Sequence, residues 1–366
     1  MSKIVSIATG VPAYKHQQQD ILSFADNIYC STEEESRKLR FLYRHSGIDT
    51  RYSILPDYGS NAADRIFYEK SADMNPFPGL EKRMECYAAH ATPLSVKTIT
   101  DCIKGKIYLE SITHLITVSC TGLSAPGLDL EIMEAMNLRP SIFRTSVNFM
   151  GCYAAVHALK LGDAICKTDS SANVVIVCIE LCTLHFQKEK SADNITSTLL
   201  FADGCAALLM QHDSAKDKGL QIESFYSEVA FKGKKDMSWQ LSSSGFLMTL
   251  TGYVPDLVKE DFDGLVKNAL AHALLDKGDI DHWCIHPGGK KILEAIEKST
   301  GLSAEQLTYA YEVLRDYGNM SSPTILFVLK KILDELESAP FEKRQHIFGA
   351  AFGPGLTMET FIATYD

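Results

Sequence analysis

The chain alternates short apolar runs rich in β-branched residues with longer segments of helical periodicity, which is the pattern of an α/β fold with buried strands. Strands are predicted at Leu115–Ser119, Ile142–Val147, Val174–Ile179, Ala206–Met210, Gly219–Val229 and His282–Ile285. Helices are predicted at Asp129–Met136, Ala154–Cys166, Val258–Leu275, Lys290–Ser299 and Pro323–Leu336. For the last helix, Ser322 is suited to cap the first turn and Pro323 to occupy the first helical position.

The length of 366 residues predicts two domain-sized units or one doubled domain. Residues 211–218 are polar and charged and lie between two predicted strands, so they are the best internal boundary. We therefore expect an N-terminal half, residues 1–215, and a C-terminal half, residues 216–366, each with its own strands and helices.

Composition places the chain among ordinary globular proteins, with 46% hydrophobic and 22% charged residues. The 36 Lys and Arg against 46 Asp and Glu give a net charge of −10, which argues against general binding to nucleic acid or to an anionic membrane. The sequence contains no run of about 18 apolar residues, so it predicts no membrane-spanning helix. The N-terminus lacks the features of a secretory signal, so we expect a cytoplasmic protein.

Ten cysteines are spread through the chain, mostly within apolar segments, and no two form a CxxC pair. Their spacing predicts neither a zinc site nor a thioredoxin-like redox site, so no metal is expected. In a cytoplasm these cysteines should stay reduced. Most of them should be small core residues, and at most one or two should be chemically active.

Cys152 is the best candidate for a reactive thiol, because a predicted strand ends before it, Gly151 permits a sharp turn, and a helix of small residues begins after it. The unpaired N–H groups and the dipole at a helix N-terminus favour a thiolate, which is a nucleophile. Tight packing of a helix on a sheet would produce the same pattern, so this motif alone leaves both interpretations open.

His286 and Asn319 supply what a nucleophilic cysteine needs. His286 follows a predicted strand and precedes a Pro-Gly-Gly turn, so its imidazole is expected at the rim of the sheet, where it can accept the thiol proton. Asn319 precedes the last helix, and its carboxamide can donate to a developing oxyanion. Together the three residues form a nucleophile, a base and an oxyanion donor.

These residues lie in the motifs GCYAA, HPGGKKIL and YGNMSSPT, and with a GPG motif near the C-terminus the chain resembles the type III polyketide synthases, the chalcone and stilbene synthase family. The resemblance extends over nearly the whole chain, and the segment from Val118 to Asp129 looks like the bacterial branch. It implies the α/β thiolase fold, in which two pseudo-symmetric αβαβα halves form five layers, and it implies a homodimer.

The resemblance also implies an acyltransferase mechanism. An acyl starter moves from coenzyme A to Cys152, malonyl-CoA loses CO2 to give an enolate, and the enolate attacks the thioester before the product cyclises or is released. His286 and Asn319 would stabilise the enolate oxygen. The coenzyme A thioesters are substrates, and no bound cofactor is implied. The starter, the number of extensions and the product are left open, with an alkylpyrone or alkylresorcinol as the leading guess.

Further residues match substrate-binding positions of the family. Phe201 matches the gatekeeper aromatic at the cavity mouth, and Met248 matches a second gatekeeper, where a flexible side chain admits a longer acyl chain. Ala125 matches the residue that enters the partner's cavity, and Trp239 replaces a glycine of the plant enzymes and should narrow the pocket. These effects have opposite signs, so pocket volume is left open. The remaining substrate-binding positions are Cys120, Cys182, His185 and Ser321.

The coenzyme A entrance departs from the plant pattern. Lys38 matches a basic residue there, whereas Phe41 and His45 stand in place of Arg and Lys. Neighbouring arginines can substitute for them, and a solvated basic helix face is the other explanation. The departure leaves open whether the starter arrives on coenzyme A or on an acyl carrier protein.

Two other functions fit the same residues. A β-ketoacyl-carrier-protein synthase III-like enzyme, which condenses once, shares the triad and would be distinguished by the length of its product. A non-catalytic thiolase-fold partner subunit is a different class, although such a scaffold needs no intact triad. A Cys-His-Asn protease is disfavoured, because the surrounding motifs match a thioester enzyme.

Overall fold

The computed structural model describes residues 1–59, 61–338 and 343–365. The strands are β1 (Ser2–Gly10), β2 (Tyr14–Gln17), β3 (Thr50–Ser53), β4 (His114–Ser119), β5 (Phe143–Asn148), β6 (Asn173–Leu181), β7 (Asp203–His212), β8 (Leu220–Val229), β9 (Met237–Ser242), β10 (Gly245–Leu250), β11 (His282–Ile285), β12 (Gln345–Gly353) and β13 (Thr357–Tyr365). The helices are α1 (Gln18–Tyr29), α2 (Glu33–Arg44), α3 (Leu80–Ile103), α4 (Leu128–Ala135), α5 (Ala154–Thr168), α6 (Ala192–Leu200), α7 (Val254–His272), α8 (Lys290–Thr300), α9 (Thr308–Tyr317) and α10 (Thr324–Ser338).

Within the described residues, nine strands form a sheet in the order β11-β12-β13-β8-β1-β7-β6-β4-β5. Two halves meet at β1 and β8, which pair only over the first residues of β1, from Ser2 to Ile4. The orders β4-β6-β7-β1 and β11-β12-β13-β8 repeat one topology, in which the first pair is parallel and the next two pairs are antiparallel. The two halves of the chain are therefore built alike.

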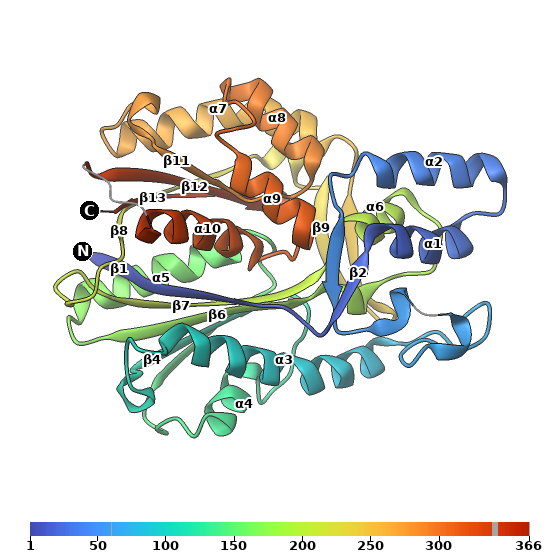
Figure 1. The fold of residues 1–366 in the computed structure, drawn as a ribbon, viewed down its shortest axis with the longest axis horizontal. Helices are drawn as coiled ribbons and strands as arrows, with labels where there is room; N and C mark the ends of the chain where they lie inside the picture. The colour runs from blue at the N-terminus through green and yellow to red at the C-terminus, as the bar shows by residue number, and fades with distance from the viewer. Residues whose placement is uncertain (60, 339–342, 366) are drawn as a thin grey trace.

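Five layers result from this repeat (Figure 1). Helices α7 and α8 cover the outer face of the C-terminal half of the sheet, and α3 and α4 cover the outer face of the N-terminal half. Helices α5 and α10 lie between the two halves, and each contacts strands of both. At one end of the sheets, α1, α2, α6, the two-stranded antiparallel sheet β2–β3 and the hairpin β9–β10 form a cap.

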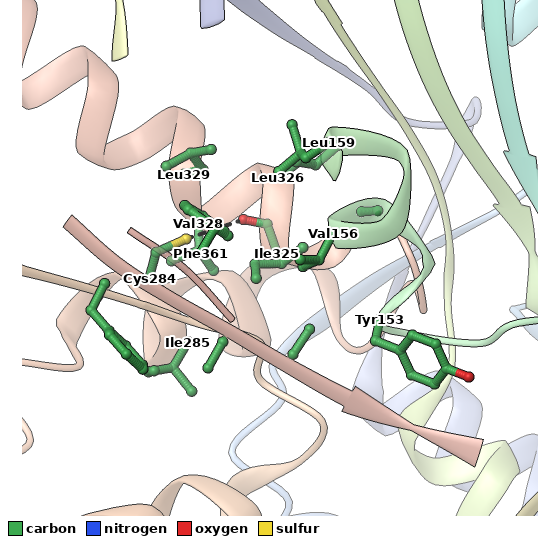
Figure 2. Packing of buried hydrophobic residues seen from close by; sticks show 14 of the residues in the cluster. Tyr153, Val156, Leu159, Cys284, Ile285, Ile325, Leu326, Val328, Leu329 and Phe361 are labelled. Carbon is green, nitrogen blue, oxygen red and sulfur yellow. Dashed lines mark hydrogen bonds between the residues drawn. The ribbon is translucent and has the colours of Figure 1, made fainter. Parts of the chain in front are cut away.

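The central layer is apolar because its helices have sheets on two sides. Figure 2 shows Ile325 and Val328 of α10 close to Val156 of α5 and Phe361 of β13, and all four side chains are fully buried. In the same cluster, Cys284 of β11 donates its S–H to the carbonyl of Ile325 at 3.6 Å. Cys284 is therefore a packed core residue, as the sequence analysis expected for most of the cysteines.

Every predicted strand and helix is present, and the largest shift is at the start of α7, which begins at Val254 rather than at Val258. The hydroxyl of Ser322 was expected to accept a backbone N–H of the first turn of α10. In the structure it donates to Glu180 Oε1 at 2.7 Å. The carbonyl of Pro323 accepts from the Phe327 N–H at 3.2 Å, the first i to i+4 bond of α10. No helix in the described parts of the chain is long and apolar enough to cross a membrane.

Candidate active site

Cys152 lies in the turn between β5 and α5, where the backbone is unusual. Phe149 has φ of 60° and Gly151 has φ of 81°, in the left-handed region that favours glycine. A Cβ on Gly151 would also overlap the ring of Pro354. Gly151 is therefore required for two reasons, and the turn it permits brings Cys152 to a cavity.

That cavity has a volume of about 310 Å³ and lies at the junction of the two halves, since Cys152 comes from the N-terminal half and His286 and Asn319 from the C-terminal half. The structure thus brings the three predicted catalytic residues to one site. Seven of the predicted substrate-binding residues line the same cavity: Phe201, Met248, Cys120, Cys182, His185, Trp239 and Ser321.

Two predicted positions lie apart from the described lining of this cavity. Ala125 is exposed in the loop before α4. Lys38 is exposed on α2, where its ammonium pairs with Glu34 at 2.6 Å. Ala125 therefore lies on the surface of the chain, and the charge of Lys38 is paired within its own helix.

His286 follows β11 and is held by its backbone. Its N–H donates to the carbonyl of Ala350 at 2.9 Å, and Phe352 packs edge-on against the imidazole with 5.7 Å between ring centroids. Within the part of the chain that the structure describes, neither ring nitrogen has a hydrogen-bond partner. Burial lowers the pKa of His286 to about 3, so the ring is neutral and offers one donor and one acceptor.

Asn319 is held on both its backbone and its side chain. Its N–H donates to the carbonyl of Leu200, and its carbonyl accepts from the Ala202 N–H, both at 2.9 Å. Asn319 and Phe201 thus form an isolated parallel β-bridge. The Oδ1 atom accepts from the Ser321 N–H at 2.8 Å, and Nδ2 donates to the carbonyl of Gly288 at 3.1 Å. These bonds leave one N–H of the amide for the cavity.

Cys152 is buried, and burial raises the pKa of its thiol to about 12. Hydrogen bonds with Ser321 and Asn319 act in the opposite direction, and the Cys152 S–H donates to the Ser321 hydroxyl at 3.5 Å. The sequence favours a thiolate here because a helix begins nearby, but burial outweighs that effect. The structure therefore favours a neutral thiol and a neutral imidazole in the lining of the same cavity.

Glu180 was missed by the sequence analysis, which considered this segment only for Cys182 and His185. It is fully buried at the end of β6 and accepts hydrogen bonds from the Cys120 N–H at 2.9 Å and the Thr121 hydroxyl at 2.8 Å, besides that from Ser322. Burial raises its pKa to about 7. A single carboxylate in the otherwise apolar run VVIVCIEL was the available signal.

Three rings form one wall of the cavity. His185 stacks on Phe246 with 4.3 Å between centroids, and Trp239 stands edge-on to both. The Nε2–H of His185 donates to Thr121 at 2.8 Å, and Nδ1 accepts from the Phe246 N–H at 3.0 Å. The Trp239 indole donates to the carbonyl of Cys120 at 2.7 Å, so this wall is rigid. Phe246 is a lining residue that the sequence analysis did not identify.

Comparison with known families gives one consistent result. The family descriptions "Chalcone and stilbene synthases, N-terminal domain" and "Chalcone and stilbene synthases, C-terminal domain" match residues 1–214 and 221–364. "Alpha-pyrone synthesis polyketide synthase-like Pks18" of Mycobacterium tuberculosis is 30% identical over 97% of this chain and 89% of the relative. A "Putative chalcone synthase" of Bacillus subtilis is 28% identical over 100% of this chain and 99% of the relative.

Solved structures agree with these sequence matches. PKS-I from the brown alga Ectocarpus siliculosus has a TM-score of 0.92 and 27% identity, covering 100% of this chain and 98% of that one. The 1,3,6,8-tetrahydroxynaphthalene synthase of Streptomyces coelicolor A3(2) has a TM-score of 0.88 and 22% identity, covering 100% and 99%. The predicted thiolase fold and the predicted resemblance to bacterial proteins are confirmed.

Proposed function

This chain belongs to the chalcone and stilbene synthase family and is a type III polyketide synthase, an acyltransferase-type enzyme, and we propose that Cys152, His286 and Asn319 carry its reaction. The observation that supports this assignment is the meeting of these three side chains at one cavity. The cavity wall that surrounds them is largely apolar and aromatic, as the binding of an acyl chain requires.

In the proposed loading step, Sγ of Cys152 attacks the carbonyl carbon of an acyl-CoA. Because the thiol is neutral at the start, its proton moves to the free acceptor nitrogen of His286 as the carbon–sulfur bond forms. The bond to the coenzyme A sulfur then breaks, and that sulfur takes the proton. The products are an acyl thioester on Cys152, free coenzyme A and a neutral His286.

In the proposed extension step, malonyl-CoA loses its carboxylate as CO2, and the remaining electron pair becomes an enolate. The N–H of His286 and the free N–H of Asn319 donate to the enolate oxygen, each contributing a few kcal/mol. The enolate carbon attacks the Cys152 thioester, and the thiolate of Cys152 leaves. The apolar ring of Phe201 beside the site would favour loss of the charged carboxylate as neutral CO2.

We propose an aliphatic acyl starter and a pyrone-type product. The support is the flexible Met248 in the lining and the name of the Mycobacterium tuberculosis relative, which includes alpha-pyrone synthesis. We also propose that the chain is divided between residues 215 and 216, in the connection from β7 to β8. The ten free thiols are in keeping with a cytoplasmic location.

A homodimer is proposed from the edge of the sheet. Strand β5 is the last strand on its side, so the backbone groups along its outer edge lack a strand partner among the described residues. Phe143 at its start is 70% exposed, which is unusual for a large aromatic residue. A second copy placed against this edge would cover both features, and the exposed Ala125 could then reach the partner's cavity.

The test is incubation of the purified enzyme with radiolabelled malonyl-CoA and acyl-CoA starters of increasing chain length. Condensation products are expected, and their masses give the number of extensions. Absence of product with every starter would contradict the proposal, and products of one extension only would favour the β-ketoacyl-carrier-protein synthase III-like alternative. Cys152→Ala should lose starter loading, whereas Asn319→Ala should retain loading and lose most decarboxylation and elongation.

A further inference from the structure

Helix α6 ends at the cavity without a glycine turn. Phe201 follows the helix directly, and its backbone is extended, with φ of −82° and ψ of 144°. The last carbonyls of a helix have no partner within that helix, and a left-handed glycine turn or water usually satisfies them. Because the chain leaves α6 in an extended conformation, the carbonyls at this end need donors from other segments.

Three consecutive carbonyls at the end of α6 accept hydrogen bonds from three such segments. The carbonyl of Leu199 accepts from Nε2 of Gln18 at 3.0 Å, and that of Phe201 accepts from Nη1 of Arg51 at 2.6 Å. The carbonyl between them accepts from the N–H of Asn319 at 2.9 Å. The backbone that carries Phe201 is therefore held between Asn319 on one side and two side chains of the cap on the other.

Arg51 connects the parts of this arrangement. It belongs to β3 and is buried, and its Nε donates to Oε1 of Gln18 at 2.9 Å. A Cβ built on Gly318, the residue before Asn319, would lie 2.8 Å from Cδ of Arg51. The stem of Arg51 thus packs against the turn that leads into Asn319, while its guanidinium holds the backbone of Phe201.

The chemistry of an arginine suits this position. The C-terminus of α6 is the negative end of the helix dipole, which favours a cation. Both acceptors of Arg51 named above are neutral oxygen atoms. A planar guanidinium can donate to two of them in a fixed geometry, whereas the single ammonium of a lysine cannot reproduce that geometry.

We propose that Arg51 is a positioning residue that fixes the ring of Phe201 relative to the amide of Asn319. This inference rests on the proposed function, in which Phe201 and Asn319 serve the decarboxylation of malonyl-CoA. Loading depends instead on Cys152 and His286, which Arg51 does not hold. Loss of Arg51 therefore impairs decarboxylation much more than loading.

The test measures two rates for each purified variant. One is the acylation of Cys152 by an acyl-CoA in a single turnover, and the other is the release of CO2 from malonyl-CoA. In Arg51→Met, kcat for decarboxylation should fall by roughly tenfold or more, while the acylation rate should stay within about twofold of the wild type. Arg51→Lys retains the charge and should recover part of the lost kcat. Gln18→Met removes the acceptor of Nε and should lower kcat in the same direction by a smaller factor.

Arg65→Met is the matched control for the loss of a buried arginine. Nη1 of Arg65 also donates to backbone carbonyls, those of Glu69 at 3.3 Å and Ser71 at 3.1 Å, and these three residues do not belong to the described lining of the cavity. Both rates of this variant should match those of the wild type. Circular dichroism checks that each variant is folded.

An equal fall in acylation and decarboxylation in the Arg51 variants would overturn the inference, because a general loss of structure would then explain the result. A higher KM for malonyl-CoA at unchanged kcat would also overturn it, because the guanidinium would then bind the substrate itself. If Arg51→Met does not fold, Arg51→Lys and Gln18→Met provide the same comparison with the same opposing outcomes. Failure of the wild type to acylate Cys152 or to release CO2 would count against the proposed function instead.

Discussion

The sulfur of Cys120 accepts the backbone N–H of Gly151 at 3.0 Å, which connects the end of β4 to the residue before Cys152. Cys120 also donates its own N–H to Glu180 and accepts the indole N–H of Trp239 through its carbonyl. One residue therefore connects the turn of Cys152, the buried carboxylate and the aromatic wall. The sequence analysis placed Cys120 in the cavity lining, and the structure adds this connecting role.

Cys120→Ala should destabilise the fold and slow acylation of Cys152. The substitution leaves the buried N–H of Gly151 without its acceptor, at a cost of about 1–3 kcal/mol in the free energy of unfolding. Cys120→Ser retains an acceptor at the same position and should lose less. Urea unfolding and starter-loading rates measure both effects, and equal losses in the two variants would argue against the importance of the Gly151 bond.

Alkylation of Cys152 by iodoacetamide should be slow near pH 7 and should accelerate steadily toward pH 10. The reason is that burial raises the pKa of Cys152 to about 12 and lowers the pKa of His286 to about 3, so the thiolate is scarce at neutral pH. Mass spectrometry of the peptide that contains Cys152 separates this thiol from the other nine. A rate that is already maximal below pH 7 would instead indicate a thiolate–imidazolium pair.

Trp239→Gly should enlarge the cavity and shift substrate preference toward longer acyl chains. The indole occupies space beside His185 and Phe246, and its removal should change the ratio of kcat/KM for long and short acyl-CoAs by roughly tenfold or more. Trp239→Phe removes the bond to Cys120 while it keeps an aromatic ring, so it is the matched control. If Trp239→Phe shifts the preference for acyl chain length as much as Trp239→Gly does, the result would contradict a role of the indole in setting pocket size.

Glu180→Gln should remove a pH-dependent part of the stability. Burial raises the pKa of Glu180 from 4.5 to about 7, so the folded state holds this proton more tightly than the unfolded chain does. The resulting stabilisation is fully present below about pH 4.5 and is lost as pH rises through about 7, with a size of roughly 3 kcal/mol. The amide retains acceptor and donor groups for the same neighbours.

Urea unfolding of both proteins between pH 5 and pH 8 provides the measurement. The wild type should lose stability relative to the Gln variant across this range. If the free energies of unfolding of the two proteins change equally with pH, Glu180 has the same pKa in the folded and unfolded states. Asp203, whose pKa burial raises to about 6, titrates in both proteins and therefore drops out of the comparison.

Helix α3 and strand β12, which the sequence analysis did not predict, are segments in which tertiary contacts override a weak local signal. Helix α3 contains Pro93, which lacks an N–H, yet the helix continues because it packs against β1, β6 and β7. Strand β12 contains Gly349, and the ring of Phe361 occupies the space where a Cβ would lie. Local propensity disfavours both segments, and packing stabilises them.

The sequence analysis could name Cys152, His286 and Asn319 as candidates because each lies in a local turn or at a strand end, and the structure brings all three to one cavity. The protonation states of Cys152 and His286 and the burial of Glu180 were decided only by the tertiary structure. Burial and contact depend on segments more than a hundred residues apart, and no local pattern records which of these segments meet. The electrostatics of this site therefore follow from the fold, while its reactive groups follow from the sequence.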